Sequence, residues 1–150
     1  MADGSTDTVA AVAGAVRTWQ SGALVRQLNA AWPFVSFGGL AEAHERGEAA
    51  EYMWQQYYDD SRQAPQLAGL HSFIAVAIHE PRLRSLLPFT SHGVLGFSRT
   101  VGYPFSGDCP WVVPLDDDRY LVKASDGREL GVADPAGSVA LVLAALDEAT

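Results

Sequence analysis

The stretch PRLRSLLPFTSHGVLGFSRTVGYPFSG, residues 81–107, lies where the sequence changes from helical periodicity to strand-like alternation. It contains no Asp or Glu, although the chain has 18 acidic residues. Its arginines and aromatic residues surround one histidine, which favours a functional surface on an otherwise acidic protein. Its candidate catalytic residues are His92, Arg99 and Tyr103, and its candidate substrate-binding residues are Arg82, Arg84, Phe89, Thr90, Ser91, Phe97 and Phe105.

Before this stretch, apolar residues recur at helical spacing. Val9, Val12, Val16 and Trp19 follow one another at intervals of three and four, which predicts a helix with one apolar face. The same spacing predicts helices within residues 24–32, 40–58 and 67–78, with a break at Gly47. The acidic side chains of the third region are expected to form a solvated face: Glu42, Glu45, Glu48 and Glu51. Residues 1–5 are expected to be a frayed tail.

Pro81 fits the first turn of a further short helix, which is predicted to run through Leu87 and to stop at Pro88. After Gly93 the period changes to alternation. Strands are predicted at residues 95–97, 111–113, 119–124 and 128–132.

Two further signals place the C-terminal elements. The Asp126-Gly127 pair predicts a type I′ hairpin between the last two strands. Asp134 followed by Pro135 predicts an N-cap and the start of a closing helix. The predicted fold is therefore α+β in one domain, residues 1–150. A helical bundle (about 6–88) precedes a small antiparallel β-meander and a C-terminal helix (about 93–148).

Charge and composition exclude several classes of function. The net charge of −8 argues against nonspecific nucleic-acid or anionic-membrane binding, because phosphate surfaces attract clustered positive charge. The N-terminus lacks the pattern of a signal peptide, and no apolar run reaches the roughly 18 residues of a membrane span. We therefore expect a cytoplasmic protein without nucleic-acid or membrane partners.

Three residues are candidates for catalysis, each with a structural alternative. An imidazole titrates near neutrality, so His92 is able to act as a base; alternatively it is a histidine that caps the turn between helix and sheet. If its face of the strand is buried, Arg99 needs a carboxylate, a carbonyl or a substrate oxyanion as partner; otherwise it is a surface arginine. Tyr103, between Gly102 and Pro104, either donates a proton to an enolate or packs against its neighbours.

No metal or cofactor is expected. His71 and His79 are eight residues apart on one predicted helix, so they do not chelate an ion as an i, i+4 pair does. The single cysteine, Cys109, excludes an internal disulfide framework and is more simply a small buried residue than a nucleophile. Nucleotide-binding and hydrolase motifs are absent from the sequence.

The sequence resembles a small, uncharacterised family encoded in actinobacterial natural-product gene clusters. The resemblance spans roughly residues 16–146 and is most specific between Pro88 and Pro104. It is carried by Pro33-Phe34-Val35, Ala41-Glu42-Ala43-His44-Glu45, Glu80-Pro81-Arg82-Leu83-Arg84, Leu87-Pro88-Phe89-Thr90-Ser91-His92-Gly93, Phe97-Ser98-Arg99, Gly102-Tyr103-Pro104 and Asp126-Gly127-Arg128. It implies a role in tailoring a ribosomally made peptide of the lanthipeptide type, beside kinase-like or lyase-like partner enzymes. It assigns no catalytic residue.

Three functions follow as hypotheses. The first is a metal-free cyclase that adds a peptide cysteine thiol to a dehydroamino acid, with His92 as base, Arg99 or Tyr103 stabilising the enolate, and Phe89, Phe97 and Phe105 as the groove. The second is a non-catalytic subunit that binds the modified precursor peptide and activates partner enzymes. The third is a pocket for an acidic or aromatic metabolite, with Arg82 and Arg99 as anion clamps.

Overall fold

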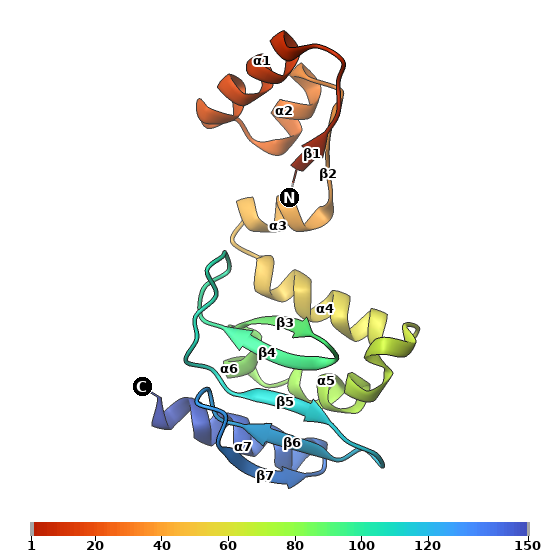
Figure 1. Ribbon diagram of the computed structural model, residues 1–150, viewed down its shortest axis with the longest axis vertical. Helices are drawn as coiled ribbons and strands as arrows, with labels where there is room; N and C mark the ends of the chain where they lie inside the picture. Colours follow the sequence, from red (N-terminus) through yellow and green to blue (C-terminus); the bar gives the residue numbers. More distant parts are fainter. Residues whose placement is uncertain (1, 150) are drawn as a thin grey trace. The chain divides into compact units, whose positions relative to one another are not determined.

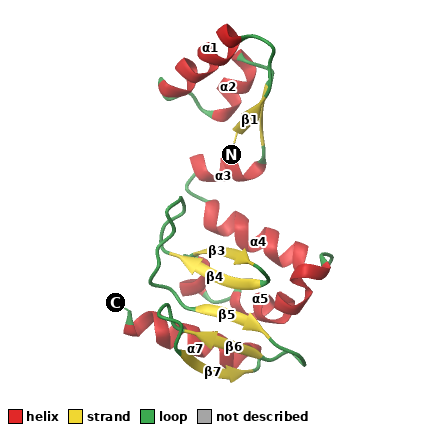
Figure 2. Ribbon diagram, in the orientation of Figure 1, coloured by secondary structure: helices red, strands yellow, loops and turns green. Residues whose placement is uncertain are grey.

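The computed structural model describes residues 2–149, and the chain divides into two compact units, unit 1 (residues 1–49) and unit 2 (residues 50–150). The described residues form helices, a two-stranded sheet and a five-stranded antiparallel sheet, with a helix closing the chain (Figures 1 and 2). This confirms the predicted α+β class. The boundary between the units follows the predicted break at Gly47, whose φ of 74° is the left-handed conformation that glycine tolerates.

Unit 1 begins with a strand. β1 (Ala2–Gly4) pairs antiparallel with β2 (Val35–Phe37). The prediction of a frayed tail is therefore wrong for residues 2–4. A ladder of backbone hydrogen bonds needs no apolar pattern, so this strand leaves no periodic trace in the sequence. The helices of the unit are α1 (Val9–Gln20), α2 (Val25–Ala31) and α3 (Gly39–Glu45).

The core of unit 1 is small and contains one close approach. Its buried cluster consists of Ala15, Leu28 and Val35, with Trp32 packed against it. A Cβ at Gly14 would overlap the Trp32 ring, so α1 meets that ring through a bare backbone. The Trp32 Nε1 donates a hydrogen bond to the Thr18 Oγ1 at 2.9 Å.

Two of the glutamates expected to form a solvated face have partners in α2. The Glu45 Oε1 accepts the N–H of Val25, the first residue of α2, at 2.7 Å. Glu42 forms an ion pair with Arg26. A carboxylate at a helix N-terminus satisfies a backbone donor that has no partner within the helix. These two side chains therefore connect α3 to α2, and the expectation of a purely solvated face is corrected.

Unit 2 holds the larger sheet. Its strands follow the order β3-β4-β5-β6-β7, each antiparallel to the next, which confirms the predicted meander. Its elements are α4 (Ala49–Ser61, starting at the unit boundary), the 3₁₀ helix η1 (Pro65–Leu70), α5 (His71–Ala77), α6 (Pro81–Arg84), β3 (Leu87–Ser91), β4 (Val94–Ser98), β5 (Trp111–Pro114), β6 (Tyr120–Lys123), β7 (Glu129–Ala133) and α7 (Pro135–Glu148).

The core of unit 2 lies between the sheet and its helices. Trp54 of α4 and Phe73 of α5 pack on Phe97 of β4, with ring centroids 6.0 and 6.5 Å apart respectively. The Trp54 Nε1 donates to the carbonyls of Leu83 and Leu86, at 3.1 and 3.0 Å. The buried indole thus keeps its polar atom satisfied while it joins α4 to the chain around α6.

The junction between helix and sheet differs from the prediction. The helix starting at Pro81 ends at Arg84, and residues 87–91 form β3 rather than a helix end. Pro88 is tolerated there because β3 is an edge strand, where one side needs no backbone donor. His92 and Gly93, with φ of 51° and 79°, form a two-residue turn of type I′ between β3 and β4.

The last hairpin uses a different turn from the one predicted. The Ala124 N–H donates to the Arg128 carbonyl at 2.8 Å, enclosing three residues, of which only Gly127 has positive φ. The type I′ prediction is therefore wrong there, because such a turn needs two residues with positive φ. The start of α7 is confirmed: the Asp134 Oδ1 accepts the N–H of Gly137 at 2.8 Å.

Candidate binding surface

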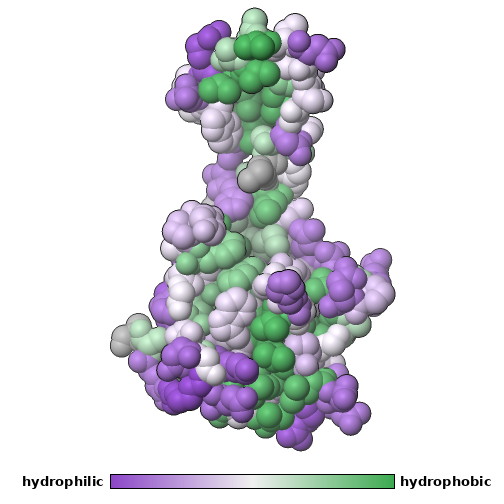
Figure 3. Space-filling view, viewed as in Figure 1, coloured by the Kyte–Doolittle hydropathy of each residue, from purple (hydrophilic) through white to green (hydrophobic). Residues whose placement is uncertain are grey.

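The side of the five-stranded sheet opposite the core, here called the open face, carries two rows of side chains. Register partners in neighbouring strands lie side by side on one face. One row consists of Phe89, Gly96, Trp111 and Lys123, and the other of Val113, Leu121 and Val132. The sheet residues that alternate with them are buried against the helices: Leu95, Phe97, Val112 and Val122. In Figure 1, α7 lies behind β6 and β7, and Figure 3 shows apolar side chains over the strands on the face toward the viewer.

Two further aromatic side chains, Phe105 and Tyr103, continue the first row beyond the edge of the sheet. The Phe89 ring meets the Trp111 ring edge-on at 5.2 Å and stacks on the Phe105 ring at 4.6 Å. The Phe105 ring in turn meets the Tyr103 ring edge-on at 6.3 Å. We call Tyr103, Phe105, Phe89 and Trp111 the aromatic row. These geometries are the ones that aromatic pairs favour.

Gly96 provides the surface on which two of these rings lie. A Cβ at Gly96 would lie 2.6 Å from an atom of the Trp111 ring and 2.8 Å from an atom of the Phe89 ring. No side chain fits at those distances without moving the rings. The bare backbone of β4 therefore lets the two rings approach each other across the strand.

Phe105 and Tyr103 belong to a loop between β4 and β5 that is tied by its own hydrogen bonds. The Ser98 Oγ donates to the Thr100 carbonyl at 2.8 Å and accepts the N–H of Ser106 at 2.9 Å. The Arg99 N–H donates to the Ser106 Oγ at 2.8 Å, and the Thr100 Oγ1 donates to the Pro104 carbonyl at 3.1 Å. We call residues 98–108 the tied loop.

An ion pair joins the two ends of the tied loop. The Arg99 Nε lies 2.7 Å from the Asp108 Oδ2. Their hydrogen bond lowers the pKa of the Asp108 carboxyl and raises the pKa of Arg99, because it favours the charged form of each group. Both side chains are more than a third exposed, so water screens the pair and its contribution to stability is small.

The tied loop presents its aromatic tip to solvent. The Tyr103 side chain is 91% exposed and Phe105 is 40% exposed. Ser98, which ties the loop, is buried. Folding has already fixed the backbone that carries these aromatic residues, so a ligand that binds them does not have to order the loop. A binding hot spot that is preorganised has this arrangement.

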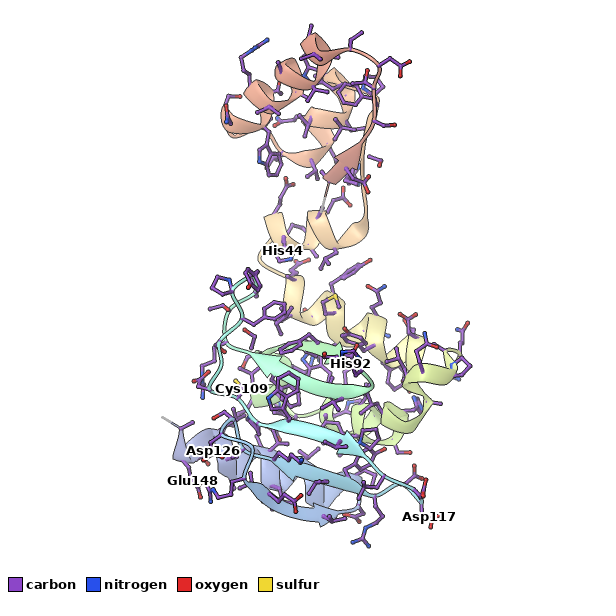
Figure 4. The ribbon with its side chains drawn as sticks, in the orientation of Figure 1. His44, His92, Cys109, Asp117, Asp126 and Glu148 are labelled. Atoms are coloured by element: carbon purple, nitrogen blue, oxygen red, sulfur yellow. The ribbon has the colours of Figure 1, made fainter. Side chains whose placement is uncertain are left out.

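The three predicted catalytic residues do not converge. His92 precedes β4 and Arg99 follows it, so the five extended residues of β4, a length of roughly 16 Å, lie between them. His92 is exposed in the hairpin turn, at the far end of the strand from the tied loop that leads to Cys109 (Figure 4). Arg99 has Asp108 as its partner, and Tyr103 extends into solvent at the tip of the tied loop. The predicted convergence of imidazole, guanidinium and phenol is wrong.

The arginines predicted to bind substrate have carboxylate partners within the chain. Arg82 forms an ion pair with Asp147 of α7, and Arg84 lies 2.7 Å from Glu51 of α4. With Arg99 held by Asp108, the acid-free stretch is neutralised by acidic residues from elsewhere in the chain. An anion clamp formed by Arg82 and Arg99 is therefore not present in the fold.

The remaining predicted substrate residues divide between the two faces of the sheet. Phe97 is buried in the core, so its assignment to a groove is wrong. The Thr90 Oγ1 lies 3.5 Å from the Tyr57 hydroxyl of α4, on the helix side, and Ser91 is exposed beside the turn. Phe89 and Phe105 do lie together on the open face.

Sequence reasoning missed Trp111 and Gly96 as members of this surface. The signal was present: Gly96 lies between Leu95 and Phe97 in an alternating strand, so its face is the one opposite the core. An isolated glycine within a strand marks a place where other groups approach the backbone closely. Which groups approach depended on the register of β3 and β5, which the sequence did not specify.

The cysteine beside the tied loop is not activated. Cys109 is buried, and its burial raises the pKa of the thiol, because desolvation disfavours the thiolate. Its Sγ lies 3.8 Å from the Ser106 Oγ and 3.7 Å from the Asp108 Oδ1. The thiol therefore stays protonated at neutral pH, which is unfavourable for nucleophilic attack.

Among residues 2–149, no group of three or more His, Cys, Asp or Glu side chains is arranged to hold a metal ion. Within the same part of the chain, no helix combines the length and apolar character needed to cross a membrane.

The fold and the open face define an α+β protein in which helices cover one side of an antiparallel meander and aromatic residues occupy the other. Residues 48–149 match the family of unknown function DUF6193, and the chain belongs to that family. The match covers almost the whole of unit 2, including the open face, and begins just before the unit boundary. Comparison with curated proteins and with solved structures gave no match.

Proposed function

We propose that the chain is a non-catalytic subunit in the modification of a ribosomally made peptide, and that the aromatic row binds an extended segment of that peptide. The biosynthetic setting rests on the sequence resemblance, and the binding role rests on the open face. The observation that carries the proposal is the exposure of Tyr103, 91%, at the tip of a loop held by its own hydrogen bonds.

The spacing of the aromatic row suits an extended peptide. Alternate side chains of an extended chain lie on the same side, about 6.6 Å apart. The Tyr103 and Phe105 rings are 6.3 Å apart, which matches this repeat, whereas the Phe105–Phe89 and Phe89–Trp111 ring centroids are closer, at 4.6 and 5.2 Å. One peptide side chain therefore meets Tyr103, and the next side chain on the same side meets the cluster of Phe105, Phe89 and Trp111. The chain's net charge of −8 favours a peptide that is neutral or basic.

The cyclase hypothesis needs a base, an enolate-stabilising donor and a groove in one place. Here the base and the donor are at opposite ends of β4, and the donor is bound to Asp108. The buried Cys109 thiol, whose pKa is raised by desolvation, offers no alternative base. The geometry therefore favours binding over catalysis.

The proposal is tested by selecting peptides from a displayed library of random linear sequences against the full-length chain. The selected peptides are then synthesised and their affinity measured by fluorescence anisotropy. We expect sequences with apolar or aromatic residues at alternate positions. The double variant Tyr103→Ala/Phe105→Ala should weaken their binding about 30-fold or more, as loss of an interface hot spot does.

Trp19→Ala is the matched control, because it removes a half-exposed aromatic ring from unit 1. Its peptide affinity should equal that of the wild-type chain. Absence of selected binders, or binders that keep full affinity for the double variant, contradicts the proposal. If the double variant binds the peptide as tightly as the wild-type chain, the peptide binds elsewhere. The edge strand β7 is then the better candidate, because Pro88 deprives the other edge strand, β3, of a backbone donor.

The non-catalytic part of the proposal has its own test. A synthetic peptide containing dehydroalanine and cysteine closes a thioether ring slowly without a catalyst, and free thiol reports the rate. We expect no acceleration by the chain. An acceleration that His92→Ala abolishes would restore the enzymatic hypothesis.

A further inference from the structure

Helix α1 of unit 1 exposes an apolar stripe. Its members are Val9, Val12, Val16 and Trp19, with exposed fractions of 86%, 46%, 47% and 51%. They follow one another at intervals of three and four residues, so they lie along one side of the helix. Apolar residues at this spacing usually face a core, yet the buried member of α1 in the core cluster is Ala15. We call these four residues the α1 stripe.

Two hollows in the surface of unit 1 meet at Trp19. One has a volume of about 510 Å³ and is lined by Val25, Ala41, His44 and Glu45 together with Ala2 and Trp19. The other, of about 240 Å³, runs beside Val12 and Val16 toward Phe34 and also includes Trp19. The stripe is therefore flanked by space into which an apolar side chain from outside fits. Figure 3 shows apolar side chains over this unit.

The distribution of charge indicates which surface packs against the α1 stripe. Arg17 is the only charged residue in α1, so the partner surface must also be apolar. Residues 1–49 contain five acidic and three basic residues, whereas residues 50–150 contain thirteen acidic and seven basic ones. Repulsion between two copies is therefore weakest where unit 1 meets unit 1.

We propose that the α1 stripe is a self-association surface, on which a second copy of the chain packs its own α1 in antiparallel orientation. A two-fold axis between Val12 and Val16 brings each Val12 opposite the Val16 of the other copy. The stripe extends over eleven residues from Val9 to Trp19, about 15 Å of helix, so the same axis brings the Val9 end of one copy to the hollow beside the Trp19 of the other.

The size of the stripe sets the strength of the dimer. The largest apolar patch on a typical monomer is roughly 300–600 Å², and a standard interface buries about 800 Å² on each partner. A stripe of four side chains is large enough to form the apolar centre of such an interface, but it leaves only a small polar rim around that centre. We therefore expect a reversible dimer with a dissociation constant in the micromolar range, about 1–100 µM.

The test is sedimentation equilibrium of the full-length chain over a range of concentrations. Val12→Glu places a carboxylate opposite Val16 of the other copy at two symmetric positions, and should raise the dissociation constant at least tenfold. Leu115→Glu is the matched control, since Leu115 is an apolar side chain of similar exposure, 44%, in unit 2. It should dimerise as the wild-type chain does.

The antiparallel geometry is tested by mixing two variants. Val12→Glu and Val16→Lys should each be monomeric alone. When they are mixed, the axis places Glu at position 12 opposite Lys at position 16, while the other pair remains valine against valine. Association should then be restored, and only as a heterodimer. A parallel pair brings position 12 against position 12 and gives no rescue.

Several results overturn the inference. One is a wild-type chain that stays monomeric up to about 1 mM, where binding is worth only about 4 kcal/mol. A monomeric chain whose stripe still binds other apolar partners also overturns it, as does a dimer that Val12→Glu leaves intact. If Val12→Glu proves unfolded by circular dichroism, dilution of the wild-type chain decides instead: the Trp19 fluorescence should shift to longer wavelength as the dimer dissociates.

Discussion

Unit 1 and unit 2 both contain tryptophans on helices with an apolar face, but the two environments are opposite. In unit 2, Trp54 is fully buried, and it belongs to a cluster of sixteen buried residues. In unit 1, Trp19 is half exposed, and the unit's described cluster has three buried residues. Helical periodicity therefore identifies an apolar face, but whether that face is covered depends on the elements available to pack on it.

The largest expected difference between the units is in the effect of losing a tryptophan. Trp54→Ala removes a buried ring together with the donor for two carbonyls, and should lower the free energy of unfolding of unit 2 by about 3–5 kcal/mol. At a protein concentration at which the chain is monomeric, Trp19→Ala should change stability by no more than about 0.5 kcal/mol. Denaturant unfolding followed by circular dichroism measures both. Equal losses would mean that the α1 stripe is covered within the folded chain.

A second prediction concerns the tied loop. Ser98→Ala removes the acceptor for the N–H of Ser106, and should cost about 1–3 kcal/mol because a partly buried donor loses its partner. It should also weaken peptide binding although it deletes no aromatic ring. Ser85→Ala, which removes an exposed hydroxyl bonded to the Arg82 carbonyl, is the control. Unchanged amide exchange in residues 99–107 of the Ser98 variant would show that the loop is held in another way.

A third, smaller effect is expected at Gly96. Gly96→Ala pushes its Cβ against the Trp111 and Phe89 rings, and should cost about 1 kcal/mol of stability in unit 2. The two rings are partly exposed and are able to tilt outward, so peptide affinity should fall more than stability does. Gly102→Ala, where an added Cβ meets no atom within 4 Å, is the matched variant. If the Gly96 and Gly102 variants bind the peptide with equal affinity, Gly96 is not part of the binding surface.

The smallest effect is the pH dependence of the Arg99–Asp108 pair. The folded chain lowers the pKa of the Asp108 carboxyl below its usual value of 3.8. Its contribution to stability is thus present above about pH 4 and is lost as the pH falls through the folded-state pKa. Because both side chains are exposed, the ion pair contributes less than about 1 kcal/mol to the free energy of unfolding. The difference in unfolding free energy between the wild-type chain and Asp108→Asn should disappear at low pH; a difference that grows on acidification would contradict this sign.

Much of the fold followed from local patterns. Helical periodicity, the alternation after Gly93 and the Asp134-Pro135 start of α7 predicted the α+β class and the meander. The elements missed were those without an apolar period. β1 has the sequence Ala-Asp-Gly, which shows no apolar period although the strand pairs with β2, and β3 contains a proline that normally argues against a strand.

The candidate site was only partly predictable. The acid-free stretch located the surface, because Phe89, Tyr103 and Phe105 do meet there. Of the two roles left open for His92, its φ of 51° favours the turn residue, because histidine is among the residues that tolerate a left-handed backbone. The ion pairs that neutralise the arginines join residues up to 65 positions apart, which no local pattern reveals.

One measurement tests the division between the two surfaces most directly: the indole N–H signals of the four tryptophans in a ¹H–¹⁵N spectrum of the full-length chain. Trp19 lies in the α1 stripe, Trp111 in the aromatic row, and Trp54 in the core. At constant protein concentration, a selected peptide should shift the Trp111 signal and leave those of Trp19 and Trp54 in place, whereas dilution without peptide should move Trp19 alone. A peptide that shifts Trp19 and leaves Trp111 unchanged would contradict the account.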